Sequence, residues 1–454
     1  MNWILNPPLN ELHPSCVEDL CEILKQVREN GSSIRVSCGS FPFRPLKDDI
    51  VVNLGRMDKL LGLDIQEKRV TVEPGMKLSA LFKILETVSL SLDMVGRVPD
   101  LTIGDALAIG LSGVQSGGTT NLIACEVLKG SGKRVKWNWE RNPNELKSLC
   151  SGLGNIAIPI SISLQCIQLQ CYVEASYLYP ISQILGQWKI LTKDSMRQQL
   201  FWFPLSDLAV LTHISSAPKY QTPEQPMLCY VSEKLGEILL RLLHHLSSVI
   251  CQQIPILSTI FARLQFFLSW TVSKNRSDFL HSLPRMWAAS EATRGSLWLL
   301  PIEQVPKVLR MVSKWAKATP HACSGPLFLQ SVSMEGISPR ESVPFIAPYL
   351  DEPSCAMWYD WFLSEKAPNP IQVAEFESIF HEAGGMRCWS ADRIISPLVL
   401  TDMFPNYNRW CNVKAQIDKY NFVQGAYIHG TVYSRSGFTD ISESTLSLCS
   451  SLCE

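Results

Sequence analysis

A glycine-centred turn, Cys38-Gly39-Ser40-Phe41-Pro42, follows the apolar segment 34–37. Glycine has no Cβ, so backbone N–H groups in such a turn can approach a bound phosphate closely. The Ser40 hydroxyl adds another hydrogen-bond donor. The turn alone is nevertheless more typical of a plain strand-to-loop connection, so a phosphate site needs support from the surrounding sequence.

A second glycine-rich segment, 102–120, carries Gly110, Gly113 and a final glycine run that offers further backbone amides. Taken by itself, this segment is typical of a loop. It also contains Asp105. A buried carboxylate repels a phosphate, so Asp105 either points away from a bound phosphate or weakens its site.

Helices and strands alternate around these segments. Apolar spacing predicts a helix that begins with a Ser15 N-cap and stops at Asn30-Gly31. Further patterns predict strands over 34–37 and 50–54, two strands within 63–73, a helix over 78–87 and a hairpin turn over 129–134. This alternation favours an α+β or α/β nucleotide-binding unit.

The segment order resembles that of the L-gulonolactone and aldonolactone oxidases, which belong to the vanillyl-alcohol-oxidase-like flavoproteins. The segments that carry the resemblance are 34–42, 72–75, 96–103, 102–113, 153–166, 202–204, 384–385, 389, 404–405 and 410–418. The resemblance implies an α+β fold with a PCMH-type FAD-binding domain of two α+β subdomains over residues 1–170. An aldonolactone-oxidase cap domain over 171–430 would follow, its last segment folding back toward the flavin, and then a polar tail over 431–454.

The resemblance also implies an FAD that is bound without a covalent link. The family turn reads Gly-Gly-Gly-His-Ser, and its histidine can carry FAD, whereas Phe41 here has no nucleophilic nitrogen. Leu111 and Ser112 stand where the family has Thr-His, and Asp105 stands at a family glycine. The implied cofactor-binding residues are Cys38, Gly39, Ser40, Phe41, Pro42, Gly96, Gly110, Leu111, Ser112, Gly113, Ala157 and Ile158.

Lactone oxidation needs a base for the hydroxyl proton and a cation beside the flavin. The family supplies them from a Glu-x-Arg pair on a cap strand and a His-Trp-x-Lys element near the C-terminus. The residues at those four positions here are Phe328, Gln330, Cys388 and Ala391. Arg387 is a tentative replacement cation, although a solvated surface arginine is the commoner role. Cys388 is expected to be a packed thiol rather than a nucleophile.

The implied activity is FAD-dependent oxidation of an L-gulono- or related aldono-1,4-lactone, with molecular oxygen as acceptor. The substituted positions predict that this activity is weak or lost. One alternative is an inactive homologue that acts by binding. Another is a flavin enzyme with a changed substrate that uses Arg387, Cys388 and Gln330 differently.

Composition restricts the partners. The chain of 454 residues has 41 basic and 42 acidic residues and no long run of one sign. It therefore lacks the clustered positive charge that binds nucleic acid. Its 15 cysteines are expected to be reduced thiols, because the N-terminus lacks a signal sequence, and their spacing predicts no metal site.

The segment 235–272 suggests a membrane partner. No Asp, Glu, Lys or Arg occurs between Leu242 and Ala262, but histidines, glutamines and Pro255 interrupt the stretch. A helical pair lying peripherally in the membrane interface is therefore favoured over a spanning helix, and a buried helical hairpin is an equal alternative. The expected location is the endoplasmic reticulum or another internal membrane, with the cytoplasm as the alternative.

Overall fold

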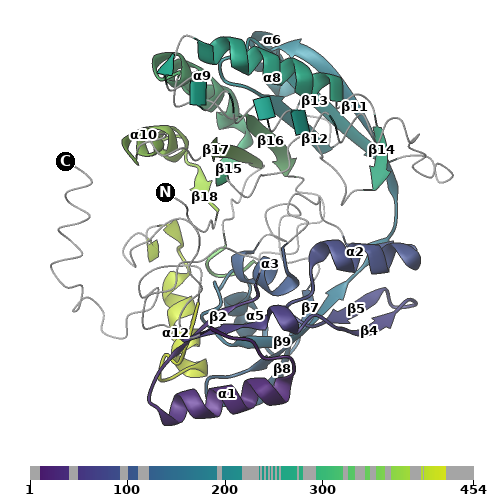
Figure 1. The fold of residues 1–454 in the computed structure, drawn as a ribbon, viewed down its shortest axis with the longest axis vertical. Helices are drawn as coiled ribbons and strands as arrows, with labels where there is room; N and C mark the ends of the chain where they lie inside the picture. The colour runs from purple at the N-terminus through teal and green to yellow at the C-terminus, as the bar shows by residue number, and fades with distance from the viewer. Residues whose placement is uncertain are drawn as a thin grey trace.

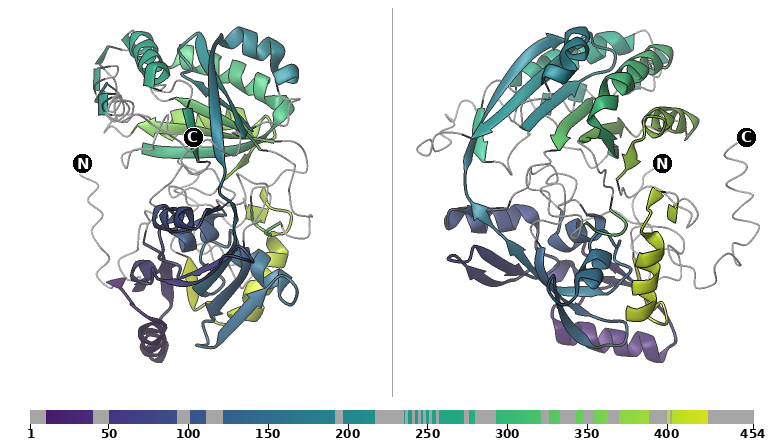
Figure 2. Two further views of the ribbon diagram at one scale, coloured as in Figure 1. Left: turned by 90° about the vertical axis from the view of Figure 1, so that its right-hand side faces the viewer. Right: turned by 180° about the vertical axis from the view of Figure 1, so that it is seen from behind.

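The computed structural model describes residues 11–39, 50–92, 101–110, 122–191, 197–216, 258–272, 276–279, 293–320, 326–332, 343–347, 354–362, 370–388, 400–401 and 403–425, with isolated residues between 235 and 257. These residues form two lobes (Figure 1). The first lobe contains the described residues up to 168 together with residues 343–347, 400–401 and 403–425, and the second contains the other described residues from 171 to 388. Figure 2 shows that the chain crosses between the lobes near the start of β11 (Cys171–Pro180).

One sheet of the first lobe is parallel. Its strand order is β1 (Glu11–Leu12), β3 (Ile50–Asn53), β2 (Ile34–Ser37) and β19 (Val423–Gly425). The preceding helix α1 (Val17–Glu29) buries Leu20, Leu24 and Val27 in the same hydrophobic cluster as Ile34, Val36 and Val52. The predicted strand 34–37 is therefore confirmed, and the strand predicted over 50–54 is present but ends at Asn53, because η1 (Leu54–Arg56) begins at the next residue.

The predicted start of α1 was wrong by one residue. The N-cap is Cys16, whose Sγ accepts a hydrogen bond from the backbone N–H of Asp19 at 3.4 Å. The Ser15 hydroxyl instead donates to the Asp19 carboxylate at 2.7 Å. Both bonds fix the first turn of the helix.

The second sheet of the first lobe is antiparallel. Its order is β4 (Leu60–Asp64), β5 (Arg69–Val72), β9 (Ile158–Gln165), β7 (Leu122–Leu128) and β8 (Arg134–Asn138). The predicted hairpin turn over 129–134 joins β7 to β8, with Lys129 N–H donating to Lys133 O at 3.0 Å. The short strands β6 (Leu90–Ser91) and β10 (Ile167–Gln168) pair separately.

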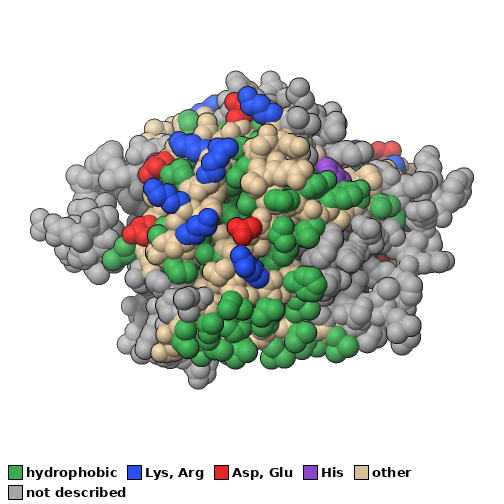
Figure 3. Space-filling model, turned by 90° about the horizontal axis from the view of Figure 1, so that it is seen from above, with side chains coloured by type: hydrophobic (Ala, Val, Ile, Leu, Met, Phe, Trp, Pro, Cys, Tyr) green, Lys and Arg blue, Asp and Glu red, His purple; other side chains and the backbone are tan. Residues whose placement is uncertain are grey.

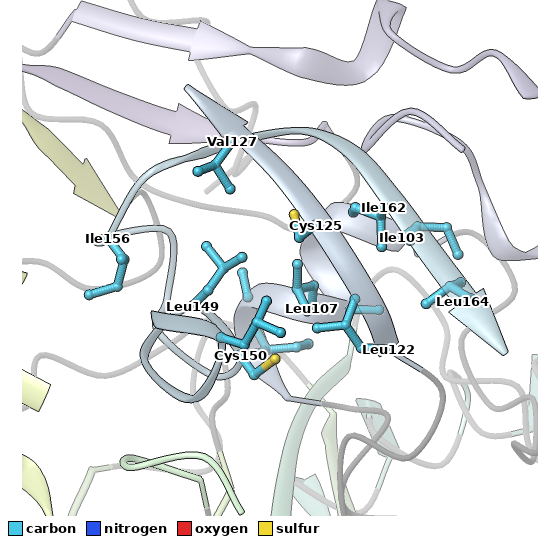
Figure 4. Close-up of a cluster of buried hydrophobic side chains, with 14 of the residues drawn as sticks. Ile103, Leu107, Leu122, Cys125, Val127, Leu149, Cys150, Ile156, Ile162 and Leu164 are labelled. Atoms are coloured by element: carbon cyan, nitrogen blue, oxygen red, sulfur yellow. The ribbon is translucent and has the colours of Figure 1, made fainter. Parts of the chain in front are cut away.

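Three helices share a core with this sheet: α2 (Leu78–Thr87), as predicted, α3 (Ile103–Ile109) and α5 (Pro143–Leu149). Figure 4 shows part of that core, where Leu107 and Leu149 lie among strand residues such as Cys125 and Leu122. The late helix α12 (Tyr407–Ile417) joins the same core, and Trp410 Nε1 donates to Ser148 O at 3.0 Å. The C-terminal segment thus returns to the first lobe.

The second lobe is built on an antiparallel sheet. Its order is β14 (Arg276–Phe279), β11, β13 (Leu208–Ser216), β12 (Arg197–Trp202), β16 (Leu327–Val332), β17 (Ser354–Phe362), β15 (Thr293–Pro301) and β18 (Met386–Arg387). The helices are α6 (Ile181–Leu191), α8 (Ser258–Val272), α9 (Val305–Ala318) after η4 (Ile302–Gln304), and α10 (Pro370–His381). Figure 1 shows α6, α8 and α9 on the side of the sheet away from the first lobe.

The structure confirms the predicted α+β class. Within the described part of the chain, no helix has the length and apolar character that crossing a membrane requires. Among the described residues of 235–272, Ala262 and Phe266 are buried, whereas many large apolar side chains such as Leu242 and Phe267 are exposed, so the alternative of a fully buried helical hairpin does not hold for them.

Candidate functional site

The glycine turn after β2 is described as far as Gly39, whose φ of +94° lies in the left-handed region that glycine adopts most easily. A Cβ at this position would lie 2.9 Å from Asn53 Oδ1 and 3.2 Å from Gly55 Cα. Asn53 Oδ1 in turn accepts from Gly55 N–H at 2.9 Å. Two backbone turns therefore meet at a spacing that requires glycine. Ser40, Phe41 and Pro42 lie outside the described residues.

The two described amides of the turn bind acceptors within the protein. Cys38 N–H donates to Asp105 Oδ1 at 3.1 Å, and Gly39 N–H donates to Ser37 Oγ at 3.1 Å. Asp105 is fully buried in the first turn of α3. Its carboxylate therefore points at the turn and not away from it. Burial, together with this carboxylate, raises the pKa of the Cys38 thiol.

Gly110 ends α3 in a left-handed conformation, with φ +69°. A Cβ on Gly110 would collide with Ser151 Oγ, a buried hydroxyl that has no hydrogen-bond partner. Ala157 and Ile158 are buried at the start of β9. The other predicted cofactor residues, Gly96, Leu111, Ser112 and Gly113, lie outside the described part of the chain.

These contacts test the fit to FAD. Gly39 and Gly110 have the left-handed backbone conformation that a phosphate-binding turn can use, and their close neighbours are the side chains of Asn53 and Ser151. The described backbone is therefore compatible with an FAD site. The group that accepts from Cys38 N–H is the carboxylate of Asp105, whereas the family resemblance places an uncharged glycine at the position of Asp105.

Phe328 and Gln330 lie two residues apart on β16. Phe328 pairs with Phe201 on one side and Trp358 on the other, and its ring centroid lies 5.3 Å from that of Trp358. Gln330 pairs with Gln199 and Ala356. Directly paired residues share a face of the sheet, so these side chains form one continuous surface. None of these neighbours carries a carboxylate or a cation.

This surface lies opposite the helices. Trp298 on β15 stacks on Phe380 of α10, and Tyr359 on β17 packs on Phe376, so both point toward the helix layer. Side chains alternate along a strand, which places Trp358, and therefore Phe328 and Gln330, on the other face. We call it the inner face. Figure 1 shows it turned toward the first lobe.

Arg387 and Cys388 occupy opposite faces at the sheet edge. Arg387 pairs with Trp298 and therefore points toward the helices, where its Nη1 lies 3.1 Å from the buried Glu377 carboxylate of α10. The expectation of a solvated surface arginine is therefore wrong, since only 11% of this side chain is exposed. A role for Arg387 beside the flavin stays a prediction.

Cys388 is buried, and its N–H donates to Leu297 O at 2.8 Å. Burial raises the pKa of the Cys388 thiol, with Arg387 lowering it by a smaller amount. A buried thiol of this kind stays protonated at neutral pH and is a poor nucleophile. Ala391 lies outside the described residues.

Gln199, which the structure places beside Gln330, was not among the residues predicted from the sequence. Its Nε2 is buried and has no hydrogen-bond partner. A buried donor without a partner is unusual and often belongs to a functional site. The only signal in the sequence was a polar residue within a strand, which is common.

The described residues show neither a disulfide nor a metal-binding cluster. The ten cysteines that the structure describes are all free. Among the described residues, no three His, Cys, Asp or Glu side chains are grouped in a way that could hold a metal ion.

Two family profiles match the chain. A profile described as D-arabinono-1,4-lactone oxidase matches residues 162–430, and a profile described as FAD binding domain matches residues 8–138.

Relatives extend the match over most of the chain. The L-gulonolactone oxidase of Scyliorhinus torazame is 21% identical over 429 residues, covering 92% of this chain and 94% of its own. That of Mus musculus is 20% identical with the same coverage. The D-arabinono-1,4-lactone oxidase of Candida glabrata is 22% identical over 207 residues, covering 44% of this chain and 39% of its own.

Solved structures show the same fold. Cholesterol oxidase from B. sterolicum has a TM-score of 0.69 at 13% identity, covering 92% of both chains. Chitooligosaccharide oxidase has a TM-score of 0.64 at 13% identity, covering 94% of this chain and 92% of its own. At such identities the likeness shows the fold alone. The profile match over 162–430, more than half of the sequence, together with the FAD-binding domain, shows that this chain belongs to the D-arabinono-1,4-lactone oxidase family of FAD-binding proteins.

Proposed function

We propose that this protein is an aldonolactone-oxidase-family flavoprotein in which lactone oxidation is weak or lost, and that it retains the binding of a sugar-lactone-like ligand. The observation that carries the proposal is Phe328, which pairs with Phe201 and Trp358 on the neighbouring strands, at the position where the family resemblance places a glutamate. Lactone oxidation needs a proton acceptor, and the aromatic ring of Phe328 cannot supply one.

When bound, FAD supplies the ring that accepts hydride from the substrate. The backbone around Gly39 and Gly110 would hold it, and the inner face of the second lobe would hold the ligand. Gln199 and Gln330 present amides there, which donate and accept hydrogen bonds with neutral hydroxyl and carbonyl groups. These groups orient a polyhydroxylated ligand but do not take its proton. Any residual oxidation would use molecular oxygen as acceptor.

Restoring the missing side chains together tests the proposal. The variant Phe328→Glu, Gln330→Arg, Cys388→His and Ala391→Lys should gain lactone-dependent hydrogen peroxide production. Groups that act as a unit give little benefit singly, so each single variant should remain inactive. A matched control with Phe328→Gln, Gln330→Met, Cys388→Asn and Ala391→Met alters the same positions without a base or a cation. Peroxide production by the unmodified protein at about 1 per second or faster would contradict the proposal.

The bound FAD should be non-covalent. Phe41 replaces the family attachment histidine, and its ring has no nitrogen to form the link. Acid precipitation should therefore release all flavin into the supernatant. Flavin that stays with the protein pellet would show that another side chain forms the link.

The second lobe supports a peripheral membrane partner. Figure 3 shows hydrophobic side chains gathered on the top face, with lysine and arginine side chains on the same face. The exposed large apolar residues of this region are Leu235, Ile238, Leu239, Leu242, Leu246, Val249, Ile254, Ile260, Leu264 and Phe267. We call them the apolar patch. On α9, Lys307, Arg310, Lys314 and Lys317 are exposed and no acidic residue occurs.

An apolar surface accompanied by basic side chains suits the interface of an anionic bilayer. The proposed location is therefore the surface of an internal membrane, such as the endoplasmic reticulum, with the cytoplasm as the alternative.

A further inference from the structure

Asp105 joins two elements that meet at the cofactor turn. It is fully buried at the third position of α3, and its own N–H donates to the N-cap hydroxyl of Thr102 at 3.3 Å. Its Oδ1 accepts from Cys38 N–H at 3.1 Å, across from the end of β2. The carboxylate is thus held between the helix and the glycine turn.

This arrangement resembles the way in which a turn holds an anion. Backbone N–H groups beside a left-handed glycine form a concave site that favours negative charge. Here Gly39 provides the left-handed residue, and the charged group on the neighbouring amide belongs to Asp105. A hydrogen bond to a carboxylate is stronger than one to a neutral acceptor. The next amide, that of Gly39, is engaged by Ser37 Oγ.

The buried charge also affects any further anion that approaches. Like charges that share a poorly solvated site destabilise each other. A cofactor phosphate at this turn would find the Cys38 amide already bound and would be repelled by the Asp105 carboxylate. The flavin ring carries no such charge, so the carboxylate would not repel it.

We propose that Asp105 is a built-in anion that takes the place of a cofactor phosphate at the Cys38 amide, so that the phosphates of FAD add little to flavin affinity. The flavin is then held mainly through its ring and ribityl chain. The inference rests on the FAD-binding domain and is independent of whether the second lobe oxidises a lactone.

Comparing two flavins on the unmodified protein tests this directly. FMN and riboflavin share the ring and the ribityl chain and both lack the adenosine, but only FMN carries a phosphate. Titration followed by flavin fluorescence should give dissociation constants within about tenfold of each other. FMN that binds more than about 100-fold tighter than riboflavin would overturn the proposal. Failure of both flavins to bind would overturn it too, because ring contacts would then not hold the flavin.

A charge-removing variant supplies the second test. Asp105→Asn keeps an oxygen that can accept from Cys38 N–H but removes the charge. FAD affinity should rise about tenfold or more, while riboflavin affinity stays unchanged. The matched control is Asp64→Asn, because Asp64 also accepts a backbone amide, from Glu67 at 2.9 Å, but in an exposed turn.

Unchanged FAD affinity in Asp105→Asn, with a folded circular dichroism spectrum, would refute the proposal. If this variant does not fold, the flavin comparison on the unmodified protein decides alone. Neither readout depends on lactone turnover, so failure here leaves the proposed function standing.

Discussion

At the scale of single residues, the proposed function depends on the side chains at the positions where the family resemblance places its base and its cation. Phe328 and Gln330 lie on the inner face of the second lobe, and Cys388 is on the same face at the sheet edge. Their side chains supply an aromatic ring, an amide and a protonated thiol. None of these three accepts a proton or carries a positive charge at neutral pH.

The Cys388 thiol should be unreactive in the folded protein. Burial raises its pKa, so at pH 8 it stays protonated, and the thiolate is the form that attacks electrophiles. Iodoacetamide should modify the exposed Cys21 and leave Cys388 unmodified until urea is added. Peptide mass spectrometry measures both sites. Equal labelling of the two cysteines without urea would contradict the assignment of Cys388 as a packed thiol.

Gln199 should show opposite effects on stability and on ligand binding. Its Nε2 is buried without a partner, and such a group costs about 1–3 kcal/mol of stability. Gln199→Leu should therefore raise the free energy of unfolding by about 1 kcal/mol in urea titrations. The same variant should reduce the thermal shift that L-gulono-1,4-lactone produces.

The neighbouring Gln198 is the control, because it pairs with His213 on the helix-facing side of the sheet and already has a bonding partner. Gln198→Leu should lose stability and keep the lactone shift. A lactone shift that survives in Gln199→Leu would remove Gln199 from the ligand site.

The sequence predicted the strand that carries Phe328 and Gln330, because the order of the motifs locates that segment along the chain. It did not predict Gln199, which becomes a neighbour of Gln330 only when β12 pairs with β16. It also missed the partner of Arg387, since Glu377 becomes a neighbour only when α10 packs on the sheet. Interactions between distant segments depend on tertiary packing, which one sequence does not display.

At the scale of elements, local patterns were the most predictable. The helix over 78–87 and the hairpin turn over 129–134 appear as expected, since their signals are short-range. The N-cap of α1 was misplaced because Ser15 and Cys16 can both accept a hydrogen bond. The Ser15 hydroxyl is used by the Asp19 side chain, which leaves Cys16 to cap the helix.

A buried ion pair fastens α12 to β19. Lys414 is fully buried and donates to Asp418 Oδ2 at 3.1 Å and to Val423 O at 2.6 Å. Asp418 also accepts from the backbone of Phe422 and Val423. Desolvation lowers the pKa of Lys414, while Asp418 opposes that change. The pair therefore holds the strand that completes the parallel sheet.

Lys414→Met should lower the free energy of unfolding by about 3–5 kcal/mol, because it leaves a buried carboxylate without its cation. The control is Arg134→Met, which breaks a pair with Glu126 in which the arginine is 54% exposed. That change should cost at most about 1 kcal/mol. Urea unfolding measures both. Equal losses in the two variants would show that the Lys414 pair does not fasten the C-terminal segment.

At the scale of the whole molecule, the proposed function places the cofactor in the first lobe and the ligand on the second. The first lobe carries the glycine turn with Asp105, and the second presents its inner face toward it (Figure 1). The apolar patch lies on the outer side of the second lobe (Figure 3), so membrane contact there would leave the inner face unobstructed.

Membrane binding should depend on the apolar patch. Leu242→Asp with Leu246→Asp alters two exposed side chains, so folding should be unaffected while co-sedimentation with anionic vesicles falls about tenfold or more. The control is Leu61→Asp, since Leu61 is 50% exposed on the first lobe. Carbonate should extract the unmodified protein from membranes. Undiminished vesicle binding by the double variant would contradict a membrane role for the patch.

The central claim is that the family site persists without its proton acceptor and cation. The most direct measurement is the rate at which L-gulono-1,4-lactone bleaches the flavin absorbance of the FAD-saturated, unmodified protein without oxygen. Losing a positioned base costs about 10²–10⁴-fold, and losing anion stabilisation about 10²–10³-fold. From a typical rate of about 10 per second, the predicted rate is about 10⁻³ per second or lower. Bleaching at about 1 per second or faster would show that this chain has an intact catalytic site.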